Sequence, residues 1–211
     1  MDETDEVRPL LDRLQAGDQQ ALGELFSIYR DRLGRMIRFR LDGRLKGRVA
    51  TSDVLQEAYI DALKRLPHYQ ADPGMPFAIW LRWVTMQRLV EVHRQHLGAR
   101  MRDAGREVVL DAGGGLAASS ARIAEFIGDL TSPSQAAQRH EMLGQLERAL
   151  DGLEPMDREV LALRHFEELS NLETAAVLGI QPAAASKRYV RALERLKGAL
   201  EQLPDFGGGG S

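Results

Sequence analysis

The segment between Leu169 and Leu200 constrains the fold more than any other part of the sequence. Ser170 and Glu173 have the spacing of a capping box, in which two side chains satisfy two backbone amides at the start of a helix. Gly179 follows a short apolar stretch, and glycine permits the left-handed backbone of a tight turn there. Pro182 suits the first turn of a longer helix. The segment therefore predicts a helix-turn-helix.

The second helix of this motif carries a basic face. A helix of this kind, with its N-terminal residues aimed at base edges, fits the major groove of DNA. The candidate DNA contacts are Pro182, Ser186, Lys187, Arg188 and Arg191. Val190, Leu193 and Leu196 are expected to pack inward. The alternative is a helical hairpin with a solvated basic face, but the cap, the glycine turn, the proline and the basic helix occur in register, which favours DNA binding.

Apolar residues recur at helical spacing along the rest of the chain, and no stretch alternates as a strand would. The expected helices cover residues 18–40, 51–67, 76–97, 122–130, 134–150, 155–169, 170–178 and 182–203, with a loop at 67–75. Small residues at 111–120 indicate a linker. We therefore expect an all-α fold of two small helical domains, 1–97 and 132–203, joined by a flexible linker, 98–131. The tail, 204–211, resembles an engineered linker unit and carries no functional argument.

Composition excludes several classes of protein. The chain has no cysteine, which excludes disulfides, thiolate zinc sites and cysteine nucleophiles. His93 and His96 lack an identifiable third metal ligand, and no phosphate-binding glycine loop is present. We expect no metal, no cofactor and no enzymatic activity. The acidic N-terminus is unlike a secretion signal, and no apolar run approaches the ~18 residues of a membrane span, so a cytoplasmic location is expected.

Charge is distributed unevenly, although the net charge is only −3. The stretch from Arg30 to Arg48 contains eight basic and two acidic residues, and the stretch from Lys187 to Lys197 contains five basic residues and one acidic residue. Basic runs of this kind are the footprint of nucleic-acid binding, although each alone is also compatible with a solvated helix face.

Two features of the N-terminal half complete the pattern. Asp53-Val-Leu-Gln-Glu57 places a polar edge on an amphipathic helix, and Phe77, Trp80 and Trp83 form an aromatic stripe beside cations. Aromatic groups next to cations can hold unstacked bases. Trp80 and Trp83 diverge by roughly 60° around a helix, so one is expected in the core and the other near DNA. The sequence does not show which of the two is the core residue.

The order of these motifs resembles the extracytoplasmic-function (ECF) sigma factors of RNA polymerase, over residues 10–97 and 140–200. The sequence around His93 and Arg102 resembles that of a planctomycete-type branch of this family. The resemblance implies that residues 1–97 correspond to region two of the family and residues 132–203 to region four. It further implies that region two binds the clamp helices of the largest polymerase subunit, and that the polymerase flap is a further contact. The implied polymerase contacts are Asp53, Leu55, Gln56 and Glu57. The implied minus-ten DNA contacts are His68, Tyr69, Gln70, Trp80, Trp83, Gln87, Arg88, His93 and Arg94.

The helix from Pro182 matches the minus-thirty-five reader of that family. Gln87, Glu91 and Ala185 replace the family's common Asn, Asp and Val, which leaves the promoter sequence open. The expected partners are core RNA polymerase and promoter DNA, with no membrane and a monomer when free; an anti-sigma factor, usual in the family, is left open. The alternative function is a stand-alone helix-turn-helix regulator that needs no polymerase and uses 1–97 for dimerisation or sensing.

Overall fold

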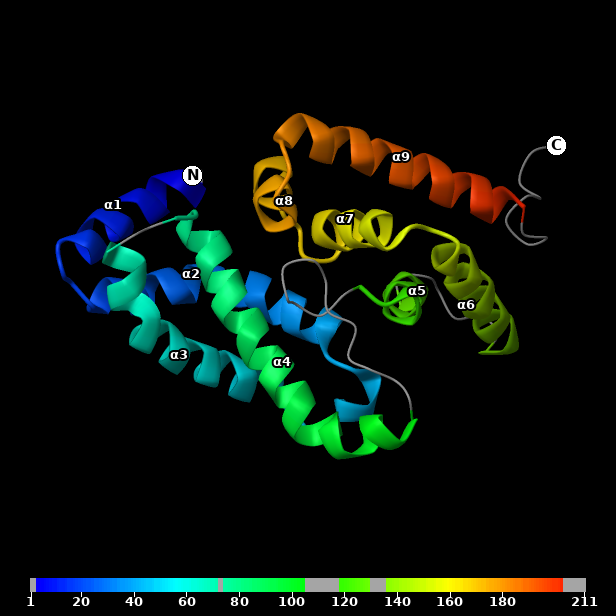
Figure 1. Cartoon of the computed structure of the whole chain (residues 1–211), viewed down its shortest axis with the longest axis horizontal. Helices are drawn as coiled ribbons and strands as arrows, with labels where there is room; N and C mark the ends of the chain where they lie inside the picture. Colours follow the sequence, from blue (N-terminus) through cyan, green and yellow to red (C-terminus); the bar gives the residue numbers. More distant parts are fainter. Residues whose placement is uncertain (1–2, 72–73, 105–117, 130–135, 203–211) are drawn as a thin grey trace. The chain divides into compact units, whose positions relative to one another are not determined.

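The computed structural model describes residues 3–71, 74–104, 118–129 and 136–202, and these residues form helices without a strand. The chain divides into two compact units, Met1–Glu107 and Val108–Ser211. The first holds α1 (Glu3–Gln15), α2 (Gln20–Arg40), the short 3-10 helix η1 (Gly43–Leu45), α3 (Thr51–Ala71) and α4 (Phe77–Ala104) (Figure 1). The second holds α5 (Ser120–Asp129), α6 (Ala136–Asp151), α7 (Pro155–His165), α8 (Asn171–Leu178) and α9 (Pro182–Glu201).

This all-helical arrangement in two units confirms the predicted fold class. The exact ranges of the two domains and of the linker stay predictions. Much of the predicted linker, and all of the predicted tail, lie outside the described residues.

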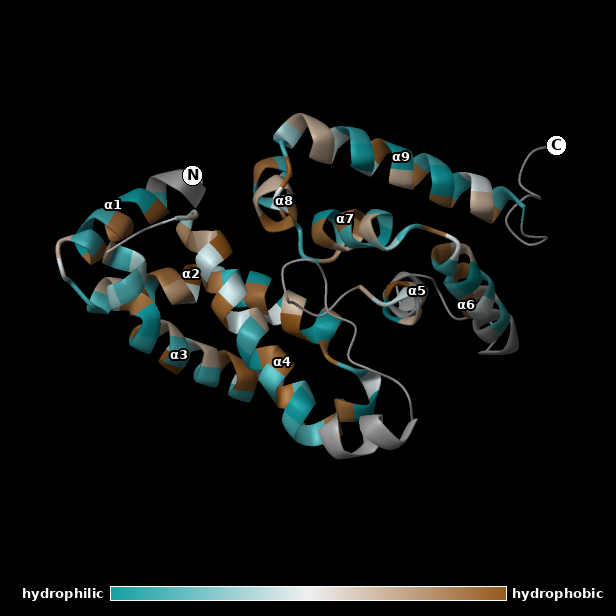
Figure 2. Ribbon diagram, viewed as in Figure 1, coloured by the Kyte–Doolittle hydropathy of each residue, from teal (hydrophilic) through white to brown (hydrophobic). Residues whose placement is uncertain are grey.

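The first unit is built around α2, which contacts α1, α3 and α4. Figure 2 shows apolar residues recurring between polar ones along α2, α3 and α4. Leu22, Leu25 and Ile37 of α2 and Leu81 and Leu89 of α4 are completely buried. Burial of one stripe of each helix is the main stabilising term for a bundle of this size.

The sequence interpretation missed α1. Val7 and Leu14 are buried against α2, and Leu10 between them is half-buried, so the helical spacing is present in the sequence. Arg13 ties the end of α1 to the next helix through Asp18 at 2.7 Å, in addition to Glu24. The signal was therefore the 3–4 spacing of apolar residues, which the acidic start of the chain obscured.

The predicted end of α3 at Pro67 is wrong, because the helix continues to Ala71 with the proline inside it. Tertiary contacts offset the hydrogen bond that proline cannot donate. Tyr69 stacks on Trp80 with ring centroids 4.6 Å apart, and Gln70 donates to the Leu14 carbonyl. The predicted loop is correspondingly shorter, and its residues 72–73 lie outside the described part.

Helix α4 also extends beyond the predicted end at Leu97, to Ala104. A single glycine such as Gly98 costs only about 1 kcal/mol inside a helix, and good helix formers follow it. Helix α7, by contrast, ends at His165 rather than at Leu169, because Glu168 has a left-handed backbone with a φ of 55° that no helix accommodates.

The second unit packs α5 on α6, and α9 on α6, α7 and α8. Its core includes Leu150, Val160 and Leu163, all completely buried. The backbone amide of Ala118 donates to the buried carboxylate of Glu159 at 2.9 Å, which fixes the approach to α5. None of the described helices combines the length and apolar character that crossing a membrane requires.

Candidate functional site

The turn between α8 and α9 has the geometry that the sequence predicts. The Ser170 amide donates to Glu173 Oε2 at 2.8 Å and the Glu173 amide to Ser170 Oγ at 3.2 Å, so both bonds of the capping box form. Gly179 is left-handed, with a φ of 64°. Asn171 then donates to the carbonyl of Pro182 at 2.9 Å, which holds the two helices together across the turn.

The rotation of α9 about its axis differs from the prediction. Val190 and Leu193 are 51% and 36% exposed, so the expectation that they pack inward is wrong, and Leu196 is only half-buried. Ala185 and Ala192 are fully buried instead. Two small residues seven apart lie on one face of a helix and allow a close approach to its neighbours, whereas larger side chains would hold the helices apart.

This rotation separates the predicted DNA contacts of α9 into two groups. Ser186, Lys187 and Arg191 are exposed, and Pro182 is half-buried at the helix start. Arg188 turns toward α7, where its Nη1 lies 3.4 Å from Asp157 Oδ1. The structure therefore places three of the five predicted contacts on a common solvent-facing side and one in an ion pair within the unit.

Asp157 is the centre of a charge cluster that the sequence interpretation missed. Its side chain is only 3% exposed, and its second oxygen lies 2.6 Å from Nη1 of Arg195. Arg195 also reaches Glu154, at 3.1 Å. Two arginines of α9, two turns apart, thus bind one buried carboxylate in the first turn of α7. Beside them the Tyr189 hydroxyl lies 3.0 Å from Nε2 of His165, which adds a further link between these helices.

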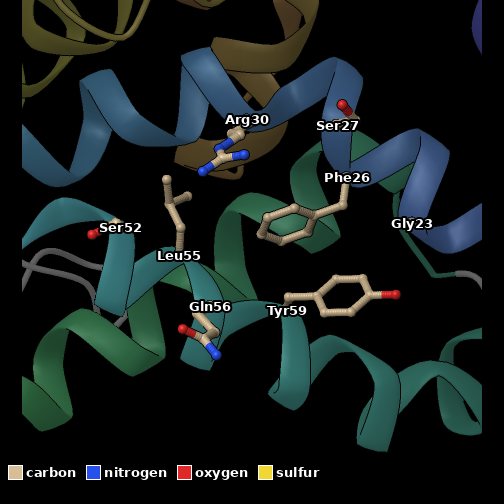
Figure 3. Close-up of a pocket in the computed structure, with 8 residues that line it drawn as sticks. All are labelled: Gly23, Phe26, Ser27, Arg30, Ser52, Leu55, Gln56 and Tyr59. Carbon is tan, nitrogen blue, oxygen red and sulfur yellow. The ribbon is translucent and has the colours of Figure 1, made fainter.

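The predicted polymerase contacts lie at the start of α3. Asp53, Gln56 and Glu57 are exposed, whereas Leu55 is only 7% exposed. Leu55 and Gln56 border a hollow of about 480 Å³ between α2 and α3. Its lining residues are Gly23, Phe26, Ser27, Arg30, Ser52, Leu55, Gln56 and Tyr59, and Figure 3 shows Phe26 and Leu55 approaching each other from the two helices. An acidic edge beside an apolar floor suits a partner that presents a basic and an apolar side chain together.

The aromatic stripe of α4 divides between the core and the surface. Trp80 is 6% exposed and packs on Tyr69 and Phe77, so it is the core residue of the tryptophan pair. Burial raises the pKa of Tyr69, whose hydroxyl donates to the Met75 carbonyl at 3.1 Å. Trp83 is 38% exposed, with the Arg65 guanidinium 5.0 Å above its ring. Trp83 is therefore the exposed member of the tryptophan pair.

Two other predicted DNA contacts have partners inside the first unit. Arg88 donates from Nε to Asp61 at 2.8 Å and lies 3.6 Å from Glu57. His93 is 4% exposed, and its Nε2 accepts the Asp42 amide at 3.3 Å. Burial lowers the pKa of His93, which favours the neutral ring that can accept this bond.

The remaining minus-ten candidates are nearer to solvent. His68, Gln70 and Arg94 are exposed, and Gln87 is half-buried. Among the described residues, no group of three or more His, Asp or Glu side chains has an arrangement that could hold a metal ion.

Known proteins share this sequence over most of its length. A family model described as "ECF sigma factor" matches residues 4–202. The ECF RNA polymerase sigma factor ShbA of Streptomyces griseus is 30% identical over 203 residues, which cover 95% of this chain and 98% of ShbA. The ECF RNA polymerase sigma factor SigD of Mycobacterium tuberculosis is 28% identical over 191 residues, with 90% and 82% of the two chains covered.

The fold also has a solved counterpart. The structure of CnrH in complex with the cytosolic domain of CnrY aligns with a TM-score of 0.51 at 22% identity, and the alignment covers 92% of this chain and 96% of that one. The helical fold, the helix-turn-helix and the match along nearly the whole chain agree, and the chain belongs to the ECF sigma factor family, whose members are transcription initiation factors of RNA polymerase.

Proposed function

We propose that this protein binds core RNA polymerase in the cytoplasm through its first unit and directs it to promoters that both units contact. The observation that carries the proposal is the exposed cationic face of α9 on a fully capped helix-turn-helix, in a chain that also carries an acidic edge beside an apolar hollow. A stand-alone regulator has no use for the second feature. The polymerase performs the chemistry, and this chain supplies recognition.

The polymerase contact centres on the start of α3. Asp53, Gln56 and Glu57 offer two carboxylates and one amide to a basic helical partner, and Leu55 contributes to the floor of the adjacent hollow. The implied partner surface is the clamp-helix pair of the largest subunit, with the flap as a contact of the second unit. Regulation by a protein that covers these surfaces, such as an anti-sigma factor, is a further part of the proposal; CnrH, which shares the fold, was solved in complex with the cytosolic domain of CnrY.

The DNA contacts fall into three roles. Trp83 and Arg94 are exposed on α4, which supports roles for Trp83 in stacking on an unpaired base and for Arg94 in contacting the opened strand of the minus-ten element. Lys187 and Arg191, together with Ser186, face the major groove of the minus-thirty-five element. The other predicted minus-ten residues, His68, Tyr69, Gln70, Trp80, Gln87, Arg88 and His93, include several that contact protein here and so support the positions of their neighbours.

Charge reversal tests the polymerase contact. Asp53→Lys with Glu57→Lys should weaken binding to core polymerase at least tenfold, because two attractive contacts become repulsive ones. The matched control is Asp12→Lys with Asp31→Lys, which reverses two exposed acids on other helices. Affinity is measured by titrating fluorescent full-length protein with core enzyme, and far-UV circular dichroism checks the helices.

Run-off transcription from a random promoter library tests the complete function. The parent chain with core polymerase should enrich two conserved promoter elements, and the Asp53 and Glu57 variant should not. Parent protein that binds DNA equally well without core polymerase, and gives no transcripts with it, would establish the regulator alternative instead.

A further inference from the structure

The connection between α2 and α3 is a basic loop, and none of the DNA or polymerase contacts proposed above involves its cations. The segment runs from Asp42 to Ala50 and contains η1. Leu45 is 1% exposed and anchors its middle in the core of the first unit. The Asp42 carboxylate accepts the Arg44 amide at 2.8 Å, and the Asp42 amide donates to His93 of α4. The loop therefore has a fixed position rather than the freedom of a solvated coil.

Cations occupy the outward positions of this loop. Arg44, Lys46 and Arg48 alternate with the buried Leu45 and with Gly47, which is left-handed at a φ of 78°. All three cationic residues are exposed. Arg44 hydrogen-bonds to Asp42 and holds the pKa of that carboxyl below its usual value, yet the Arg44 side chain stays 50% exposed. The fixed inward side chain thus directs its neighbours toward solvent.

Two other cations lie near the same end of the unit. Arg38 is exposed in the last turn of α2, immediately before the loop. Arg94 is exposed on α4 and adjoins His93, which contacts the loop across 51 positions of sequence. Figure 1 shows η1 beside the later turns of α4. We call Arg38, Arg44, Lys46, Arg48 and Arg94 the basic end.

The charge balance is unusual for this chain. Between residues 38 and 48 there are five basic residues and one acidic residue, a net charge of +4, in a protein whose net charge is −3. Arg40 is buried, and the other four basic residues of this stretch are exposed. The acidic residue, Asp42, is already engaged by Arg44. A surface of this kind has the composition that attracts phosphate groups, because lysine and arginine displace the counterions condensed on DNA.

We infer that the basic end binds the phosphate backbone of duplex DNA next to the DNA segment that α4 contacts. The inference rests on the proposed function and adds a sequence-independent contact to it. Arg48 has the fork geometry that suits phosphate oxygens, and Lys46 supplies a point charge. Arg44 binds Asp42 through Nε and Nη2 and so contributes through its remaining Nη1. Because the loop is already fixed, little backbone conformational entropy is lost on binding. His93 contributes indirectly, by holding the loop, rather than by touching DNA.

The test uses holoenzyme assembled from core polymerase and the full chain, bound to a promoter duplex selected from a random library. Lys46→Gln with Arg48→Gln removes two charges without leaving Asp42 unpaired, and a triple variant adds Arg44→Gln. The matched control, Arg8→Gln with Lys64→Gln, removes two exposed cations from α1 and α3. Affinity is measured between low and moderate salt, for the promoter and for a scrambled duplex, together with affinity for core polymerase alone.

Each lost phosphate contact should reduce the slope of log affinity against log salt by about 0.9. For the double variant the slope should fall by about 1.8, so a twofold rise in salt should weaken its DNA binding about 3.5-fold less than it weakens the parent. The preference for promoter over scrambled DNA, and the affinity for core polymerase, should equal those of the parent. The control should keep the parental slope.

Parental slopes in both the double and the triple variant would overturn the inference, while the Asp53 and Glu57 variant and run-off transcription by the parent still report on the proposed function. A loss of core affinity with an unchanged DNA slope would also overturn it, because the basic end would then face an acidic surface of the polymerase. Failure of the parent itself to form promoter-binding holoenzyme would remove the proposed function, and this inference with it. Circular dichroism of the variants confirms that the helices are retained.

Discussion

Replacing Asp157 with alanine tests how the second unit fixes the orientation of α9. The carboxylate is 3% exposed in the first turn of α7 and contacts Arg195 at 2.6 Å and Arg188 at 3.4 Å. The two arginines are seven positions apart, so they project from one face of α9 two turns from each other. One acidic side chain therefore restrains both the rotation and the tilt of the helix.

The expected cost follows from these contacts. A hydrogen bond to a charged group contributes about 1.5–3 kcal/mol. The Arg195 contact is short and the Arg188 contact is long, and both guanidinium groups retain access to water that can replace the carboxylate. We therefore expect Asp157→Ala to lower the free energy of unfolding of the second unit by about 2 kcal/mol. For a unit of this size the melting temperature should fall by about 10 °C.

The chain offers a natural assay, because its two tryptophans, Trp80 and Trp83, both lie in the first unit. Tryptophan fluorescence follows unfolding of that unit alone, whereas far-UV circular dichroism follows both. The matched control is Asp151→Ala, which removes an exposed acid from α6. In Asp157→Ala only the dichroism transition should move. A shift of less than about half a kcal/mol, or an equal shift in fluorescence, would refute this account of α9.

Three further predictions concern single residues. Because burial lowers the pKa of His93 from 6.5, the imidazole of the unfolded chain is protonated at a higher pH than that of the folded chain. The free energy of unfolding of the first unit should therefore decrease below pH 6.5, by up to about 1.4 kcal/mol per pH unit. Urea titrations followed by fluorescence should show this slope, and His93→Gln should lack it. Gly179→Ala should cost about 1 kcal/mol by circular dichroism from backbone strain alone, since the φ is 64° and no atom lies within 4 Å of the added methyl group. Trp80→Ala should cost about 3–5 kcal/mol and Trp83→Ala about 1 kcal/mol, because only the first is buried, and equal losses would contradict the division between core and surface.

Local signals in the sequence predicted most of the fold. The capping box at Ser170 and the left-handed Gly179 depend on neighbours within a few residues, and both form as expected. Pro67 did not end α3, because Tyr69 and Gln70 gain contacts with distant residues. A helix-breaking residue indicates only the local energetic cost of continuing the helix. The tertiary contacts that offset this cost cannot be predicted from the periodicity of the sequence.

The rotation of α9 could not be predicted from hydrophobicity alone. Val190 and Leu193 are the more apolar residues, yet Ala185 and Ala192 face the core. The distance between packed helices depends on side-chain size, so two alanines at heptad spacing specify a closer contact than larger side chains permit. The signal was present in the sequence as a pair of small residues seven apart, but it competes with an equally regular apolar pattern on the adjacent face.

The pairing of two predicted site residues could not be read from the sequence for a related reason. Arg88 and Arg188 are cations on the two helices assigned to DNA, and the contact with promoter that the resemblance implies for both stays a prediction. In this structure each contacts an aspartate of another helix, Asp61 at 27 positions and Asp157 at 31 positions along the sequence. Pairings over such separations leave no periodic pattern, so only the structure distinguishes a cation that holds the helix from one that faces outward.

In both units the cations of the helix assigned to DNA therefore fall into two groups, those that hold the helix in place and those that face outward. A largely buried aspartate pairs with one arginine in the first unit and with two in the second, and so fixes the helix, while neighbours such as Arg94 and Lys187 remain exposed on its outer side. The two groups should therefore have separable effects in DNA-binding assays. Loss of a fixing pair changes the position of every outward residue, so it should alter sequence preference together with stability. Loss of an outward cation removes one phosphate or base contact and should leave stability unchanged. The free energy of unfolding of each variant therefore shows whether a cation of these helices fixes the helix or faces outward.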